Sequence, residues 1–197
     1  LAQPSLDLIW IVLIGGFAIR NAAAYGRVAD LQETLNSLTA GDAVSREFRG
    51  VDANLTLRHF ADEYILNTAQ SPVYFAASDG RYRGLVTVDD LRAIERSQWD
   101  VMTLQDIARS LDSIPSVREN TPLPAVINTL EQQTLSYITV LTPADAVAGV
   151  IDRGDVVRAM AQRMNLAISE ALIQTIKENG EYPPGLRLES LAKGAME

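Results

Sequence analysis

The chain has 197 residues, no cysteine and a formal net charge of −8. This length suffices for one paired module with extensions, and the negative charge argues against nucleic-acid binding through a basic face. The absence of cysteine excludes disulfides and thiolate metal sites. The sequence contains no Walker-type phosphate loop, and its single histidine, His59, belongs to no catalytic motif. We therefore expect this segment to have no catalytic site, metal or resident cofactor.

The first predicted element is an apolar helix over residues 8–19, preceded by Asp7 and followed by Arg20. A membrane span needs about 20 apolar residues, and Ala22 to Tyr25 lengthen this one. A secretory signal would carry a basic residue ahead of the apolar run, where this chain has Asp7. A buried soluble helix remains an alternative. We favour a last transmembrane helix, whose basic C-terminal side faces the cytoplasm.

An amphipathic connector is predicted next, because Val28, Leu31, Leu35 and Leu38 recur on one helical face. The first division of the chain is therefore residues 1–37, which hold the apolar helix and this connector.

A repeat organises the middle of the chain. Gly84 to Asp90 and Gly149 to Asp155 nearly match, and their glycines lie 65 residues apart. At the same offset, each copy has a helix, two β-branched or aromatic strands joined by a turn, and a second helix. Neither copy can bury its sheet alone, so we expect one α/β (α+β) globule of two β-α-β-β-α repeats, with boundaries at 38–98 and 99–164.

Each repeat predicts a helix that begins directly after its last strand. Thr87 and Asp152 are suitable N-caps, and Asp90 and Asp155 would lie in the first turn, where negative charge suits the helix dipole. Capping alone accounts for all four residues if the pair has only a structural role.

The remaining residues, 165–197, read as a C-terminal helix and tail. The helix is predicted to continue from Met164 and to end at Asn179-Gly180. We expect the tail to pack against the repeats.

The motif Gly-apolar-apolar-Ser/Thr-x-x-Asp, which leads from the last strand into the last helix, resembles that of CBS domains, named after cystathionine β-synthase. Gly84 to Asp90 matches it fully, whereas Gly149 to Asp155 has Asp152 in place of the hydroxyl residue. The resemblance covers about residues 38–164, and the two copies in register resemble the usual tandem CBS pair.

This resemblance implies a regulatory module that binds AMP, ADP or ATP between its repeats. Thr87 would contact phosphate or ribose, and Asp90 and Asp155 would accept hydrogen bonds from ribose hydroxyls. Backbone near Val73 and Ile138 would frame the base. Because the Asp152 carboxylate repels phosphate, we expect one dominant site at the Thr87 motif.

A looser resemblance joins these parts to site-2 protease-type zinc metalloproteases with CBS domains. It rests on the apolar helix, on Asn21 to Ala24, and on the link containing Trp99-Asp100-Val101 and Thr103 to Ile107. It implies a zinc-binding HExxH helix upstream of Leu1, a membrane-bound parent, and a cytoplasmic CBS module that forms a homodimer. A module of a transporter or channel, or a scaffold without ligand, remains an alternative.

Overall fold

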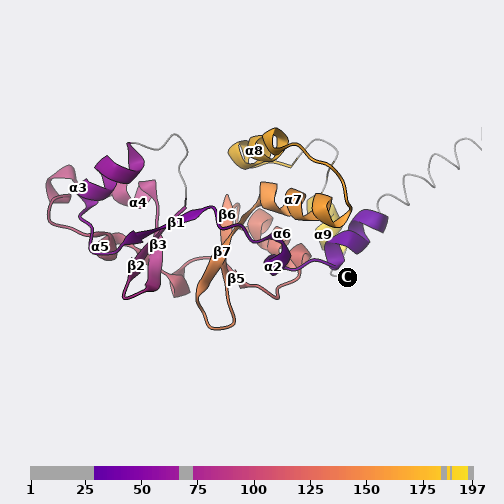
Figure 1. Ribbon diagram of the computed structural model, residues 1–197, viewed down its shortest axis with the longest axis horizontal. Helices are drawn as coiled ribbons and strands as arrows, with labels where there is room; N and C mark the ends of the chain where they lie inside the picture. The colour runs from indigo at the N-terminus through magenta and orange to yellow at the C-terminus, as the bar shows by residue number, and fades with distance from the viewer. Residues whose placement is uncertain (1–28, 67–72, 183–185, 187, 195–197) are drawn as a thin grey trace, which may run out of the picture.

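The computed structural model describes residues 29–66, 73–182, 186 and 188–194 (Figure 1). The predicted transmembrane helix within residues 1–28 lies outside this range. Within the described residues, no helix combines the length and the apolar character that a membrane span requires.

The N-terminal sheet has four strands in the order β1-β2-β3-β4. β1 runs parallel to β2, whereas β2, β3 and β4 pair antiparallel. The turn between β2 and β3 uses Asp79 and Gly80 with positive φ values of 52° and 71°. The strands and the helical segments around them are β1 (Phe48–Asp52), α3 (Leu57–Phe60), a π-helical turn (Ala61–Ile65), β2 (Val73–Ser78), β3 (Arg81–Val86), α4 (Val88–Arg92), a 3₁₀ turn (Arg96–Gln98), α5 (Leu104–Ile107) and β4 (Arg109–Ser110).

The C-terminal sheet has three strands in the order β5-β6-β7. β5 runs parallel to β6, and β6 pairs antiparallel with β7, which repeats the pattern of β1, β2 and β3. This sheet and its helices comprise residues 29–36, which are helical, α2 (Ala40–Ala43), a 3₁₀ turn (Leu111–Ser113), β5 (Ser116–Arg118), α6 (Leu123–Gln132), β6 (Tyr137–Leu141), β7 (Val147–Asp152), α7 (Arg153–Arg163), α8 (Glu170–Asn179) and α9 (Leu188–Gly194).

The two repeats exchange their first helices. α2 belongs to the first repeat by sequence, yet Ala40 and Ala43 are buried in the core of the C-terminal sheet. α5 belongs to the second repeat, yet Leu104 is fully buried in the core of the N-terminal sheet. Backbone bridges Thr39–Pro122 and Thr56–Thr103 mark the two crossings. Each repeat therefore completes the apolar core of the other.

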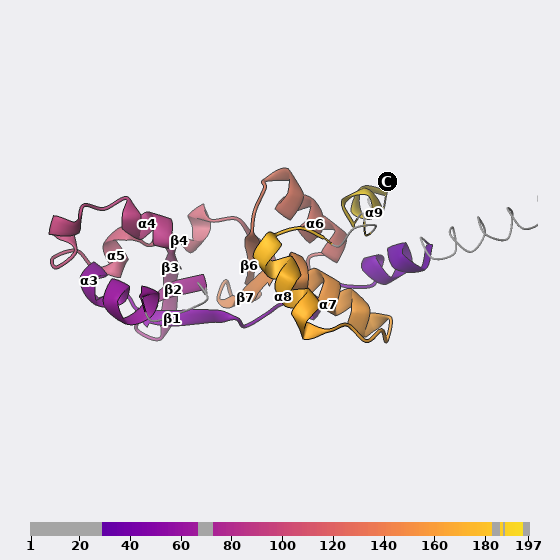
Figure 2. The ribbon, with the colours of Figure 1, turned by 90° about the horizontal axis from the view of Figure 1, so that it is seen from above.

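A third core joins the two sheets. Figures 1 and 2 show the sheets at the centre, with α3, α4 and α5 at one end and α6 to α9 at the other. Phe75 is fully buried between the repeats, and the Phe48 ring packs edge-on against it at 5.4 Å between centroids. Aromatic pairs of this geometry add to the apolar burial that stabilises the interface. The buried members of this core are Phe75, Leu85, Ile114, Val147 and Val150.

The two motif glycines lie at the closest approach of the repeats. A Cβ atom added to Gly149 would be 2.2 Å from the backbone oxygen of Ser45, and one added to Gly84 would be 2.4 Å from that of Arg109. Ser45 and Val150 exchange two backbone hydrogen bonds of 2.9 and 3.0 Å. The glycines are therefore required because the segment that crosses to the other repeat runs directly over them.

The predicted hairpins and N-caps are confirmed, but the helix expected to continue from Met164 is not. α7 ends at Arg163, Asn165 takes a left-handed φ of 54°, and a separate α8 starts after the Ser169 cap. Gly180 ends α8 with a φ of 65°, as predicted.

The connector and the tail both pack on the second repeat. Leu35 and Leu38 of the connector are buried in the core of the C-terminal sheet. Leu188 and Ala192 of α9 are fully buried in the same core. The connector thus joins the second repeat before the chain enters β1 of the first.

We expect Gly149→Ala to lower the free energy of unfolding by about 1–3 kcal/mol, because overpacking against a fixed backbone forces a shift of the chain. The matched control is Gly194→Ala, where the nearest atom is the mobile amide end of Gln32 at 3.3 Å. Denaturant unfolding of both variants measures the effect. Equal stability of the two variants would contradict the role of Gly149.

Candidate functional site

The two motif helices start at equivalent places in the two repeats. α4 begins directly after β3 with Thr87 as its N-cap, and α7 begins directly after β7 with Asp152 as its N-cap. In both, the carboxylate of the aspartate three residues later accepts a hydrogen bond from the backbone N–H of the cap residue, which completes a capping box. Both copies therefore have the N-cap that the sequence predicts.

In the first repeat, Thr87 and Asp90 form a tight polar pair. The Thr87 hydroxyl donates to Asp90 Oδ2 at 2.6 Å, and the Thr87 backbone N–H donates to the same oxygen at 2.9 Å. The Asp90 side chain remains 23% exposed, so one face of the carboxylate is accessible.

Two residues of the second repeat approach this pair. Arg109, on β4, places its Nε 3.3 Å from Asp90 Oδ2, and its side chain is 46% exposed. Tyr137, at the start of β6, packs against the core between the sheets. Burial raises the pKa of the Tyr137 phenol, while nearby Arg109 lowers it and Asp90 raises it further. We call Thr87, Asp90, Arg109 and Tyr137 the first-repeat site.

Sequence reasoning missed Arg109 and Tyr137 because neither belongs to the motif. At the offset of 65 residues, their counterparts are Val44 and Pro72, which share none of their chemistry. The crossing segment brings Arg109 to Asp90, and the packing of the two sheets brings Tyr137 there.

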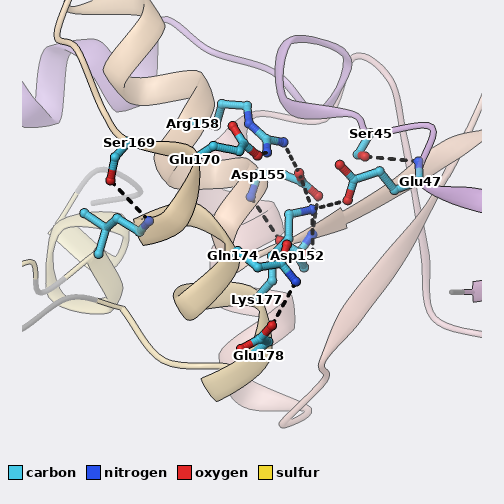
Figure 3. Close-up of polar contacts among 11 residues, drawn as sticks. Ser45, Glu47, Asp152, Asp155, Arg158, Ser169, Glu170, Gln174, Lys177 and Glu178 are labelled. Atoms are coloured by element: carbon cyan, nitrogen blue, oxygen red, sulfur yellow. Dashed lines mark hydrogen bonds and ion pairs between the residues drawn. The ribbon is translucent and has the colours of Figure 1, made fainter. Parts of the chain in front are cut away.

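In the second repeat, the equivalent aspartate is enclosed by charged side chains. Lys177, on α8, places its Nζ 2.8 Å from Asp155 Oδ1, 3.1 Å from Asp152 Oδ2 and 2.8 Å from Glu47 Oε2 (Figure 3). Arg158 Nη1 lies 3.0 Å from the same Asp155 oxygen. The Asp155 side chain is only 2% exposed. We call Glu47, Asp152, Asp155, Arg158 and Lys177 the second-repeat cluster.

Burial and the Asp152 carboxylate raise the pKa of Asp155 to about 6, against the lowering effect of Lys177. Burial alone would lower the pKa of Lys177, but hydrogen bonds to Asp155 and Glu47 outweigh it and hold the pKa above the ordinary value. The ammonium group is therefore charged, and the cluster is held together by it.

The remaining predicted site residues lie in the sheets. Val73 starts β2, pairs with Phe48, and packs against the core between the sheets. Ile138 pairs with Ile151 and buries its side chain in the core of the C-terminal sheet. Any contact with a ligand at Ile138 would therefore come from its backbone, in agreement with the expectation from the sequence.

The single histidine contacts a carboxylate at the surface. His59 Nε2 lies 2.6 Å from Glu63 Oε2, one turn further along, and both side chains are more than half exposed. Among the described residues, no group of three or more His, Asp or Glu side chains is placed to hold a metal ion.

Comparison with known proteins identifies the repeat. A model of the CBS domain family matches residues 102–162. Two relatives are named "putative zinc metalloprotease": one from Synechocystis is 27% identical over 152 residues, and one from Mycobacterium tuberculosis is 25% identical over 150 residues. These alignments cover 77% and 76% of this chain. The chain spans only 40% and 38% of the length of these relatives.

Solved structures share the fold of the pair. The crystal structure of CBSX2 in complex with AMP superposes with a TM-score of 0.52 at 21% identity, covering 64% of this chain and 97% of that one. The CBS domain of a bacterial CNNM/CorC family Mg²⁺ transporter in complex with ATP gives 0.53 at 14% identity, covering 70% and 97%. The exchanged helices, the paired sheets and these matches together show that residues 102–162 are similar to the CBS domain family and that the chain has the fold of a CBS pair.

Proposed function

We propose that this chain is a regulatory CBS pair that binds an adenine nucleotide at the first-repeat site. The observation that carries the proposal is the meeting of Asp90 with Arg109 and Tyr137, which come from the other repeat. A ligand held there would contact both repeats at once. Its binding would therefore favour one relative arrangement of the repeats over another.

Each residue of the first-repeat site suits one part of a nucleotide. The Asp90 carboxylate can accept hydrogen bonds from two ribose hydroxyls. The Arg109 guanidinium is half exposed and can turn from Asp90 to a phosphate, which it matches in charge and geometry. The Tyr137 ring offers a face for the base, and Thr87 adds a hydroxyl. AMP, ADP and ATP share all these groups.

The parent protein is proposed to be a membrane-embedded zinc metalloprotease of the site-2 type. The similarity to the two named relatives supports this, because it extends over about three quarters of the chain. The zinc and the protease residues would lie in the part of the relatives that this chain does not span. Residues 8–25 would be the last transmembrane helix, and the CBS pair would lie in the cytoplasm and form a homodimer.

The packing of the connector supports a route from the nucleotide to the membrane. The 29–36 helix buries Leu35 in the core of the C-terminal sheet, so movement of the second repeat would move the connector with it. A nucleotide that shifts one repeat against the other would thereby act on the chain that leads to the membrane segment.

Nucleotide binding is tested by isothermal titration of the full chain in detergent micelles with AMP, ADP and ATP. We expect binding, and we expect Asp90→Ala to lower the affinity about tenfold or more, because a hydrogen bond to a charged group contributes about 1.5–3 kcal/mol.

Asp106→Ala is the matched control for Asp90→Ala. Asp106 forms the same capping box with Thr103, with hydrogen bonds of 2.7 and 2.9 Å, but it lies on α5 outside the first-repeat site. Both variants lose a cap worth about 1 kcal/mol, and only Asp90→Ala should lose the nucleotide. No heat with any of the three nucleotides, or equal loss in both variants, would refute the site.

The protease assignment predicts that a zinc chelator stops substrate cleavage by the full-length parent while the AMP affinity of this chain stays unchanged. AMP is the suitable ligand because its binding does not depend on Mg²⁺ that the chelator would also remove. The coding sequence upstream of Leu1 gives a second test. Several apolar spans without an HExxH helix would favour a transporter or channel instead.

A further inference from the structure

The two equivalent aspartates differ in accessibility. The Asp90 side chain is 23% exposed, whereas the Asp155 side chain is 2% exposed. Both follow a motif glycine at the same distance along the chain, and both complete a capping box. The difference must therefore come from what covers them, and the covering element at Asp155 is α8.

α8 lies directly on the first turn of α7. A Cβ atom added to Gly154 would be 2.6 Å from Lys177 Cγ and 3.1 Å from the backbone oxygen of Ile173. Ile173 and Ile176 anchor α8, because they are 0% and 3% exposed within the core of the C-terminal sheet. The space in front of the second motif is thus filled by the chain itself.

The charge of α8 complements the site that it covers. Lys177 contacts Asp152, Asp155 and Glu47, as Figure 3 shows, and its side chain is 11% exposed. Arg158 joins Asp155 to Glu170 at the start of α8. Glu47 precedes β1, so the same ammonium group also ties α8 to the segment that crosses to the first repeat.

Each repeat places a cation against its motif aspartate, but the two cations differ in exposure. Arg109 lies against Asp90 and remains half exposed, so a ligand can reach it. Lys177 lies against Asp155 and is satisfied by three carboxylates. A phosphate entering the second repeat would have to displace these carboxylates from Lys177. The buried Asp155 would then lose one of its two cations, which is costly for a carboxylate that is only 2% exposed.

We propose that α8 occupies the space in front of Asp152 and Asp155 that a ligand of the second repeat would take, with Lys177 bound to both carboxylates, so that each chain binds one nucleotide and not two. This inference rests on the proposed function of the first-repeat site.

The small number of lysines allows a direct test of whether α8 stays over Asp155. Lys177 and Lys193 are the two lysines of the sequence. The Lys193 side chain is 59% exposed in a pair with Glu189, so it serves as an internal reference. Amine acetylation of the full chain, followed by peptide mass spectrometry, should label Lys177 at least about tenfold more slowly than Lys193, because its ammonium group is buried and paired. Saturating AMP or ATP should leave this ratio unchanged.

The number of nucleotides bound is the second test of the proposal. Titration of the full chain should give one nucleotide per chain. Asp155→Asn should bind with an affinity within about twofold of the parent chain, whereas Asp90→Asn should lose about tenfold or more. Asp106→Asn, which removes the same negative charge from a capping box outside the first-repeat site, is the control for changes of charge and should bind like the parent chain.

The outcomes separate the two proposals. Three results would overturn the occupation by α8 while the proposed function stands. They are the binding of two nucleotides per chain, an equal loss of affinity in Asp155→Asn and Asp90→Asn, and labelling of Lys177 at the rate of Lys193 when nucleotide is added. If none of the three nucleotides binds, the proposed function is wrong, and so is the proposal of one nucleotide per chain. If Asp155→Asn does not fold, the labelling ratio of the parent chain still decides.

Discussion

The approach of each motif glycine to the backbone of the other crossing segment is the contact on which the rest of the structure depends. Gly84 lies under Arg109 and Gly149 lies under Ser45, too close for any side chain. This contact lets α2 and α5 exchange places, so that each repeat completes the core of the other. The two repeats consequently form one packed unit, and a group bound between them would contact both.

The same exchange makes the pair asymmetric. The segment that crosses at Gly84 brings Arg109, whose guanidinium reaches Asp90. The segment that crosses at Gly149 brings Val44 and Ser45, which carry no charge, and Asp155 instead receives its cation from α8. A buried carboxylate needs such a partner, because leaving it without one costs several kcal/mol. In the second repeat, the charge of Asp155 is therefore balanced by Lys177 of the same chain. The first repeat retains an accessible carboxylate and an exposed cation.

Much of the fold was predictable because the signals are local. The hairpins follow from β-branched runs and turn residues, and the N-caps Thr87 and Asp152 follow from their place after a strand. The continuity of the C-terminal helix from Met164 was wrongly predicted, although its end at Gly180 was correct. Residues 164–169 show no strong breaker, and the left-handed turn at Asn165 arises as α8 folds back onto α7.

The sequence by itself determined the repeat, its period of 65 residues and the motif residues Thr87, Asp90 and Asp155. These follow from local patterning, which one chain displays without knowledge of distant contacts. Only the tertiary structure decided that Arg109 and Tyr137 join Asp90, and that Lys177 covers Asp155 from 22 residues further along the chain. Such contacts depend on which chain segments cross between the repeats and on how α8 packs. No spacing within the sequence encodes that arrangement.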